Sequence, residues 1–263
     1  MKSQARGRSQ KAEVHTFPMS YVVGTDVPEP ARDQRIWRYV KLSWFMYLLT
    51  EKKLYFSRLW ELEDSWEGRV SYAQVNDLCA DMDDTQHREF LPTLLQLYTN
   101  FAAGCAISCW HASDTESVAM WQLYATGTDG IAISTTVEKL ESSLAFDGVR
   151  DMNFHIGNVQ YIDHEANVLT ERPPERITAL QSLFQKSREY SHEREVRFIL
   201  ILPQGKSSLQ NSVIPLRNLN FIDEIIVSPT FPSWALPSIQ SILSTVGVTA
   251  PIKTSMLTGR LRP

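Results

Sequence analysis

The sequence predicts an α+β fold, a single mixed α/β domain with a central, mostly antiparallel split sheet flanked by helices. Short runs rich in β-branched and aromatic residues alternate along the chain with segments whose apolar residues recur at helical spacing. No internal repeat and no Pro- or Gly-rich linker interrupts this alternation after residue 35. The length of 263 residues suits one such domain.

The first 34 residues differ from the rest of the chain. They have no sustained apolar period, and they include Pro28 and Pro30. We therefore expect residues 1–34 to form a basic, flexible N-terminal arm and residues 35–263 to form the globular domain. The basic residues at the start of the arm are Lys2, Arg6, Arg8 and Lys11.

The first half of the domain begins with a β-prone run and an amphipathic helix. This helix ends in Lys52 and Lys53, whose charges suit a helix C-terminus. Apolar residues at helical spacing then indicate a long helical stretch, although Pro92 falls inside it. In order, we expect a strand at 35–40, a helix at 42–53, a strand at 54–59, an acidic loop at 61–68, helices within 71–103 and a buried strand at 105–111.

The second half continues the alternation. Ser113 and Asp114 are candidate caps for the next helix, and Gly127 and Gly130 bracket its end. In order, we expect a helix at 116–126, a strand at 130–137, a strand at 159–162, a helix at 174–190, strands at 195–202 and 221–227, a helix at 234–246 and a strand at 251–256.

Composition restricts the class of protein. A net charge of −4 argues against a protein that coats DNA generically. Three cysteines do not form a closed disulfide framework, so we expect a reducing, cytoplasmic location. The longest apolar run, residues 101–110, is too short to span a bilayer, so no membrane partner is expected.

Metal-ligand spacing is absent from the sequence. Cys105 and Cys109 in one strand lie roughly 13 Å apart at about 3.3 Å per residue, which is too far for a shared zinc ion even with His111 nearby. We expect structural cysteines and no metal cofactor. The sequence also has no Gly-rich phosphate loop, no G-x-S-x-G and no H-E-x-x-H motif.

A set of polar residues lies at strand ends. Arg38 and Tyr39 belong to the first strand, and Ser57 ends the second. Glu193, Glu195 and Arg197 alternate, so in a strand they share one face. That face is either the solvated side of an edge strand or the wall of a pocket that Arg38 and Ser57 line from the opposite side.

Six of the seven tryptophans lie before residue 122, which suggests a second feature. Trp121 and Tyr124 are three residues apart on one helix and therefore share a face. Together with Trp66, in the acidic loop next to Glu67, they predict an aromatic-acidic cleft. Core packing is the alternative for each of these side chains.

A series of motifs in fixed order resembles domain of unknown function family 2971, a group of bacterial proteins. The resemblance covers about residues 35 to 229, with Ser65 standing where proline is usual. The motifs are Arg38-Tyr39, Leu54-Tyr55-Phe56-Ser57, Glu63-Asp64-Ser65-Trp66-Glu67, Cys109-Trp110-His111, Met120-Trp121-Gln122-Leu123-Tyr124-Ala125, Gly130-Ile131-Ala132-Ile133 and Glu193-Arg194-Glu195-Val196-Arg197.

The order of elements in this family is similar to that of ADP-ribosyltransferase-like folds, which implies NAD as co-substrate. By this resemblance Arg38 would hold the NAD ribose or phosphate, Ser57 would line the nicotinamide pocket, and Glu195 would stabilise the ribosyl cation. It also implies an unidentified macromolecular acceptor or protein partner, and a place in bacterial or phage defence. We expect Tyr39, Trp66, Glu67, Trp121, Tyr124 and Glu193 to bind substrate or cofactor.

Two other functions remain open on the sequence. The first is a non-catalytic module whose aromatic-acidic cleft binds a nucleotide, a peptide or a protein. The second is a metal-dependent nuclease that would use Asp64, Glu67, Glu193 and Glu195 around a divalent ion.

Overall fold

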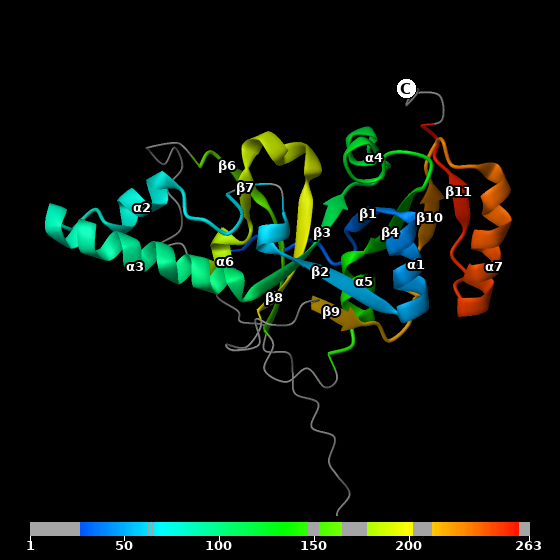
Figure 1. The fold of residues 1–263 in the computed structure, drawn as a ribbon, viewed down its shortest axis with the longest axis horizontal. Coiled ribbons are helices and arrows are strands. Elements are labelled where there is room, and N and C mark those ends of the chain that lie inside the picture. The colour runs from blue at the N-terminus through cyan, green and yellow to red at the C-terminus, as the bar shows by residue number, and fades with distance from the viewer. Residues whose placement is uncertain are drawn as a thin grey trace, which may run out of the picture.

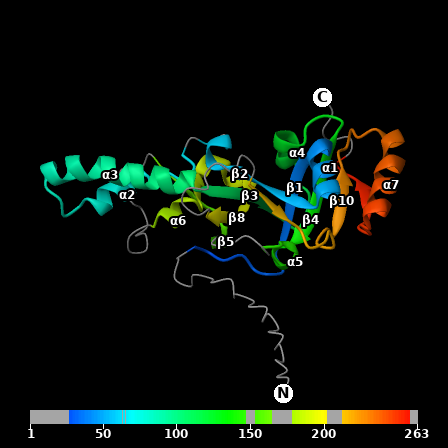
Figure 2. The ribbon, with the colours of Figure 1, turned by 60° about the horizontal axis from the view of Figure 1, so that its bottom comes forward.

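The computed structural model describes residues 27–62, 64, 66–146, 153–164, 178–201 and 212–257. A large twisted sheet forms the centre, helices pack on it, and the α2–α3 pair projects away from one end (Figure 1 and Figure 2). The helices are α1 (Leu42–Glu51), α2 (Tyr72–Leu78), α3 (Asp84–Ala103), α4 (Val118–Tyr124), α5 (Val137–Ser143), α6 (Ala179–Ser182) and α7 (Leu236–Val246), with 3-10 turns η1 (Leu59–Glu61), η2 (Arg188–Glu193) and η3 (Ser233–Ala235).

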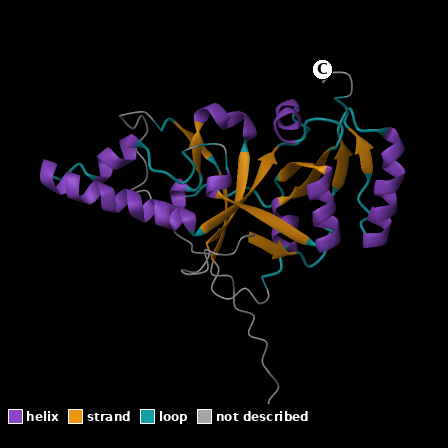
Figure 3. Ribbon diagram, viewed as in Figure 1, coloured by secondary structure: helices purple, strands orange, loops and turns teal. Residues whose placement is uncertain are grey.

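Nine of the described strands form one unclosed sheet, and two more form a small separate pair (Figure 3). Within the large sheet, all pairings are antiparallel except the one between β10 and β11. The expected α+β fold is therefore confirmed. The strands are β1 (Arg35–Lys41), β2 (Lys53–Arg58), β3 (Cys105–Ala112), β4 (Gly130–Thr136), β5 (Asn153–Asn158), β6 (Gln160–Ile162), β7 (Gln185–Ser187), β8 (Glu195–Ile201), β9 (Ser212–Pro215), β10 (Glu224–Val227) and β11 (Ile252–Thr254).

The sheet is split beside β3. One edge of β3 pairs with β8 along seven residues. The other edge is shared, because β2 pairs with Ala106 and Ile107 whereas β1 pairs with His111 and Ala112. Between these two pairings, β1 and β2 diverge and leave residues 108–110 of β3 without a strand on that side.

Strand alternation separates the apolar residues into clusters on the two faces of the sheet. Helices α1, α5 and α7 cover the main core, which includes Ile36, Phe45 and Phe198. Helix α4 packs on the opposite face, where Trp121 contacts the cluster of Trp37 and Tyr39. This arrangement follows from the period of two in β1, because Ile36 and Trp37 point to opposite faces.

Several predicted boundaries are wrong. The helix predicted at 42–53 ends at Glu51, because Lys52 adopts a left-handed conformation and Lys53 begins β2. Ser117, not Ser113 or Asp114, caps α4 with its side chain. The strands β5, β7 and β9 were not predicted.

The helix predicted at 174–190 is also wrong over its described part. Only α6 is α-helical, the chain then runs extended through β7, which pairs in parallel with β6, and a 3-10 turn, η2, begins at Arg188. The helical spacing of Leu180, Leu183 and Phe184 reflects their burial in a third cluster. A hydrogen bond of 2.9 Å from Gln74 to Gln185 holds the extended segment.

The described end of the N-terminal arm lies against the domain. The carbonyl of Pro28 accepts a hydrogen bond of 2.8 Å from the amide of Asn158, and Val27 packs on the cluster around Phe184. Residues 1–26 lie outside the described residues, so the division at residue 34 stays a prediction. No described helix is both long enough and apolar enough to cross a membrane.

Gly68 provides a test of the packing that supports the acidic loop. Its φ is +70°, and a Cβ there would lie 2.5 Å from Leu59 Cδ2 and 3.2 Å from Leu183 Cδ2. We expect Gly68→Ala to lower the free energy of unfolding by about 1 kcal/mol for the left-handed backbone, and by about 1–3 kcal/mol more for overpacking. Gly247→Ala is the matched control, because Gly247 has φ +79° but nothing within 4 Å of its Cβ position. The measurement is the free energy of unfolding in urea. Equal losses of this free energy in Gly68→Ala and Gly247→Ala would show that the contacts around Gly68 do not contribute.

Candidate active site

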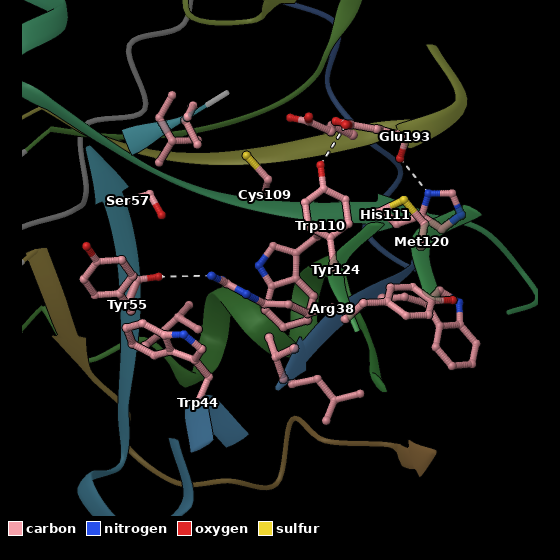
Figure 4. Close-up of a pocket in the computed structure, with 18 of the residues that line it drawn as sticks. Arg38, Trp44, Tyr55, Ser57, Cys109, Trp110, His111, Met120, Tyr124 and Glu193 are labelled. Atoms are coloured by element: carbon pink, nitrogen blue, oxygen red, sulfur yellow. Dashed lines mark hydrogen bonds between the residues drawn. The ribbon is translucent and has the colours of Figure 1, made fainter. Parts of the chain in front are cut away.

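A cavity of about 440 Å³ opens at the split in the sheet. Its walls come from β1, α1, β2, β3, α4 and the η2 region, elements that are far apart in the sequence (Figure 4). A volume of this size is typical of small-molecule sites. The divergence of β1 and β2 therefore produces the cavity, since no strand fills the space beside residues 108–110 of β3.

Seven of the nine predicted site residues line this cavity. They are Arg38, Tyr39, Ser57, Glu67, Tyr124, Glu193 and Glu195. Ser57 and Tyr55 share a face of β2, because side chains of a strand alternate between faces. Glu195 and Arg38 line the same cavity, as expected, and the role of each residue stays a prediction.

Trp66 and Trp121 do not belong to the described lining of this cavity. The ring of Trp66 stacks on His164 at 5.0 Å between ring centroids. Trp121 is fully buried, packs edge-on against Tyr39 at 5.1 Å and donates a hydrogen bond to Glu116. The predicted cleft formed by Trp66, Trp121 and Tyr124 is therefore wrong in its two tryptophans, because packing against neighbouring rings takes them away from the cavity.

A charged cluster of five buried side chains closes one end of the cavity. Lys186 Nζ donates to Glu193 Oε2 at 2.6 Å and to Glu195 Oε1 at 2.7 Å. Arg197 Nε donates to the other oxygen of Glu195 at 2.7 Å. Arg197 also forms a bidentate ion pair with Glu67, with Nη2 at 2.8 Å from Oε1 and Nη1 at 2.7 Å from Oε2.

This cluster contradicts the edge-strand interpretation of the charged stripe. Strand β8 pairs with β3 on one side and with β5 on the other. Glu195 and Arg197 are buried, with Arg197 completely inaccessible to solvent. Glu193 belongs to η2 rather than to the strand, and Arg194, with φ 44°, separates it from β8.

The cluster controls the ionisation of its carboxylates. Burial alone would raise the pKa of Glu195, but the charges of Arg197 and Lys186 outweigh burial and hold that pKa well below its usual value. Burial, together with the neighbouring Glu195, raises the pKa of Glu193 to about 7. Three carboxyls face two cations, so a proton on Glu193 neutralises the cluster.

Tyr124 extends the cluster from α4. Its hydroxyl donates to Glu193 Oε1 at 2.7 Å, and its ring lines the cavity (Figure 4). Burial and the charge of Glu193 raise the pKa of Tyr124, so the phenol keeps its proton. The backbone carbonyl of Glu193 also contacts His111 Nδ1 at 2.6 Å, which ties η2 to β3.

Arg38 lies in the gap between β1 and β2. Its guanidinium donates to Ser108 Oγ and, at 3.5 Å, to the carbonyl of Tyr55, and it lies 5.6 Å from the Trp110 ring centroid. Among the described residues, no carboxylate forms an ion pair with Arg38, and burial lowers its pKa. The half-buried cation therefore has no counter-charge of its own in the described structure.

Sequence reasoning missed Lys186, Trp44, Tyr47 and Tyr55, all of which line the cavity. Tyr55 shares the face of Ser57, so strand alternation could have indicated it. Trp44 and Tyr47 are three residues apart on α1 and could have been found by the same helical spacing that was applied to Trp121 and Tyr124. Lys186 carried no signal, because its segment was predicted to be helical.

The nuclease alternative finds no support in this geometry. Among the described residues, no three His, Cys, Asp or Glu side chains are arranged to hold a metal ion. Asp64 instead accepts hydrogen bonds from Ser187 and from the amide of Trp66. The carboxylates of Glu67 and Glu195 are engaged by Arg197 and Lys186, which occupy the positions that a divalent ion would need.

Comparison with known families identifies one segment of the chain. Residues 120–198, from α4 to β8, match the family described as "Protein of unknown function (DUF2971)". The family resemblance is thus confirmed over this segment. The matched segment includes the Met120 to Ala125 motif and the Glu193 to Arg197 motif, whereas the Arg38 and Ser57 motifs precede it. No curated protein matches the sequence.

Solved structures of DarT from Thermus sp. 2.9 resemble the fold distantly. The complex with ADP-ribosylated ssDNA has 10% identity and a TM-score of 0.37, covering 88% of this chain and 98% of that one. The NAD+ complex has 10% identity, a TM-score of 0.38 and coverage of 85% and 96%. The carba-NAD+ complex has 8% identity, a TM-score of 0.37 and coverage of 87% and 98%. At TM-scores below 0.5 we draw no argument from this likeness.

The proton on Glu193 can be tested through stability. A carboxyl whose pKa rises from 4.5 in the unfolded chain to about 7 in the folded protein loses its stabilising contribution as the pH rises through that window. We expect the wild type to lose on the order of 1 kcal/mol between pH 6 and 8 relative to Glu193→Gln, because one pKa unit corresponds to about 1.4 kcal/mol. The difference between the two proteins removes the contributions of the histidines. Thermal unfolding at both pH values is the measurement, and parallel profiles would contradict a protonated Glu193.

Proposed function

We propose that the protein uses NAD in ADP-ribosyl transfer, either to a macromolecule or to water. The observation that supports this proposal is the presence, in one cavity, of an ionised carboxylate and of a guanidinium that has no counter-charge among the residues that the structure describes. These groups are Glu195 and Arg38, and Ser57 and Tyr124 complete the wall between β2 and α4. The order of elements that the resemblance to domain of unknown function family 2971 implies supports the same proposal.

Arg38 fits the role of a diphosphate ligand. A guanidinium forms paired hydrogen bonds with phosphate oxygens, and Arg38 has donors beyond those used by Ser108 and Tyr55. Its cost of burial is offset when an anion binds. Ser57 offers a hydroxyl on the cavity side of β2, where it can hydrogen-bond a carboxamide or a sugar.

Glu195 fits the role of an electrostatic stabiliser. NAD, when bound, supplies a ribosyl group whose bond to nicotinamide breaks through a positively charged, oxocarbenium-like state. A carboxylate that is already ionised and fixed by Lys186 and Arg197 needs little reorganisation to stabilise such a charge. Glu193, with a pKa near 7, is able to accept the proton released by water or by an acceptor hydroxyl.

A second candidate function is a ligand-binding module without catalysis. It is favoured by the observation that both oxygens of Glu195 already accept charged hydrogen bonds, from Lys186 and Arg197. A carboxylate neutralised in this way has less negative potential to offer a cation. The two functions differ in a direct assay of NAD cleavage.

The test measures nicotinamide release and NAD affinity in parallel. We expect the purified protein to release nicotinamide from NAD, and Glu195→Gln to lower turnover at least ~100-fold while NAD affinity stays within a few-fold. Because this change leaves Lys186 and Arg197 without a full partner, we also expect a loss of about 3–5 kcal/mol of stability. The assay therefore runs well below the melting temperature of the variant, with circular dichroism as a check on folding.

Glu189→Gln is the matched control, because Glu189 lies in the same η2 turn but is exposed and does not line the cavity. Its nicotinamide release is expected to equal that of the wild type. A second assay supplies labelled NAD together with nucleic acid or protein as acceptor. If the protein binds NAD but neither cleaves it nor labels an acceptor, the proposal of an enzyme is rejected and the binding module is favoured. Absence of NAD binding would reject both uses of NAD.

A further inference from the structure

Three aromatic side chains form one wall of the cavity mouth, which we call the aromatic rim: Trp44 and Tyr47 from α1 and Tyr55 from β2. The rings of Trp44 and Tyr55 lie 5.0 Å apart with planes tilted by 36°, and Trp44 contacts Tyr47 edge-on at 6.1 Å. All three line the cavity.

Trp44 is about half exposed at the mouth of the cavity. Its exposed fraction is 48%, whereas Phe45, Leu48 and Leu49 of the same helix are buried in the main core. The helix therefore does not need Trp44 for packing. An exposed large aromatic residue at the edge of a cavity is a common mark of a binding surface.

The rim lies next to Arg38. The guanidinium of Arg38 hydrogen-bonds the carbonyl of Tyr55, which places the cation directly behind the rim. In the close-up view, Trp44 and Tyr55 lie on one side of Arg38 and Glu193 lies on the other (Figure 4). The cavity thus presents aromatic rings, a cation and carboxylates in succession.

We propose that the aromatic rim binds the adenine base of NAD. This inference rests on the proposed function and adds an orientation to it: the adenine stacks on Trp44 and Tyr55, the diphosphate meets Arg38, and the nicotinamide riboside lies at the carboxylates. Planar bases stack on aromatic side chains without any requirement for a specific hydrogen-bond pattern. A dinucleotide has the same succession of base, anion and sugar that the cavity presents.

A base from a nucleic-acid acceptor is the other chemistry that could stack here. A nucleic-acid groove combines aromatic residues with a basic track for the backbone. Around the rim the charges are instead mixed, because Lys53 pairs with Glu51 and Lys41 pairs with Asp129. Glu61 accepts a hydrogen bond of 2.7 Å from the Tyr55 hydroxyl. The rim therefore favours the base of a small dinucleotide over a polyanion.

The experiment compares Trp44→Ala with Trp60→Ala by calorimetric titration. Trp60 is the matched control, because it follows β2, has an exposed fraction of 64% and does not line the cavity. The probes are NAD, ADP-ribose and nicotinamide mononucleotide, of which only the last lacks adenosine. We expect Trp44→Ala to weaken NAD and ADP-ribose binding about 5- to 100-fold. Nicotinamide mononucleotide binding is expected to stay unchanged, as is every affinity of Trp60→Ala.

Further readouts separate this inference from the proposed function. Trp44→Phe is expected to restore most of the NAD affinity, because a phenyl ring still offers a face on which the base can stack. An unchanged NAD affinity in Trp44→Ala would overturn the proposed adenine site, but it would not contradict the proposal that the protein cleaves NAD. A loss of affinity for single-stranded DNA or RNA with unchanged NAD affinity would also overturn it and assign the rim to the acceptor. No NAD binding by the wild type would reject the proposed function and the adenine site together.

Discussion

The buried ion pairs of Arg197 hold the site together. Its guanidinium is inaccessible to solvent and bonds Glu195 in β8, Glu67 in the acidic loop and the carbonyl of Leu183 after α6. Three segments that are distant in sequence are thereby fixed around one side chain. An unpaired charge at such depth is far more costly than an exposed one, so each partner depends on the others being in place.

Glu67 is backed by Gly68, whose left-handed backbone and close packing leave no room for another side chain. The position of the acidic loop is thus a consequence of the charges in β8.

The split in the sheet supplies the space that these charges face. If pairing on this edge of β3 continued from β2 to β1 without a gap, strand backbone and side chains would fill the cavity, and Arg38 would be a buried cation needing a carboxylate. Because they diverge, Arg38 satisfies the carbonyl of Tyr55 on the open edge of β2 and keeps donors for a ligand. The same divergence places α1, which connects the two strands, beside the opening. The gap therefore leaves the carbonyl of Tyr55 in β2 and the hydroxyl of Ser108 in β3 to be satisfied by a side chain, and Arg38 bonds both.

The sequence predicted the sheet better than it predicted the site. Short runs rich in apolar, β-branched and aromatic residues located β1, β2, β3, β4 and β8 within a residue or two, because strands at the centre of a sheet are largely buried and carry a strong apolar signal. It failed where tertiary contacts override local preference. The apolar spacing of Leu180, Leu183 and Phe184 resembles a helix, yet Lys186 must be extended to reach two carboxylates. Trp66 and Trp121 were predicted to line a cleft, but Trp66 stacks on His164 and Trp121 packs edge-on against Tyr39, away from the cavity. Residue type alone did not distinguish these tryptophans from Trp44, which differs only in what its neighbours leave uncovered.

The two glutamates of the Glu193-Arg194-Glu195 segment show how local backbone assigns different roles to identical side chains. In a regular strand both would share one face and one environment. Here Arg194 adopts φ 44°, an uncommon conformation for a residue other than glycine, and its carbonyl is held by the amide of Ala112. The turn brings both carboxylates to Lys186 but leaves only Glu195 in contact with Arg197. Glu195 stays ionised between two cations, while Glu193, next to a neutral phenol, has a pKa near 7. The left-handed backbone of one residue, Arg194, therefore gives two neighbouring glutamates different partners and pKa values that are pushed apart, as acid and base chemistry requires of a pair of carboxyls.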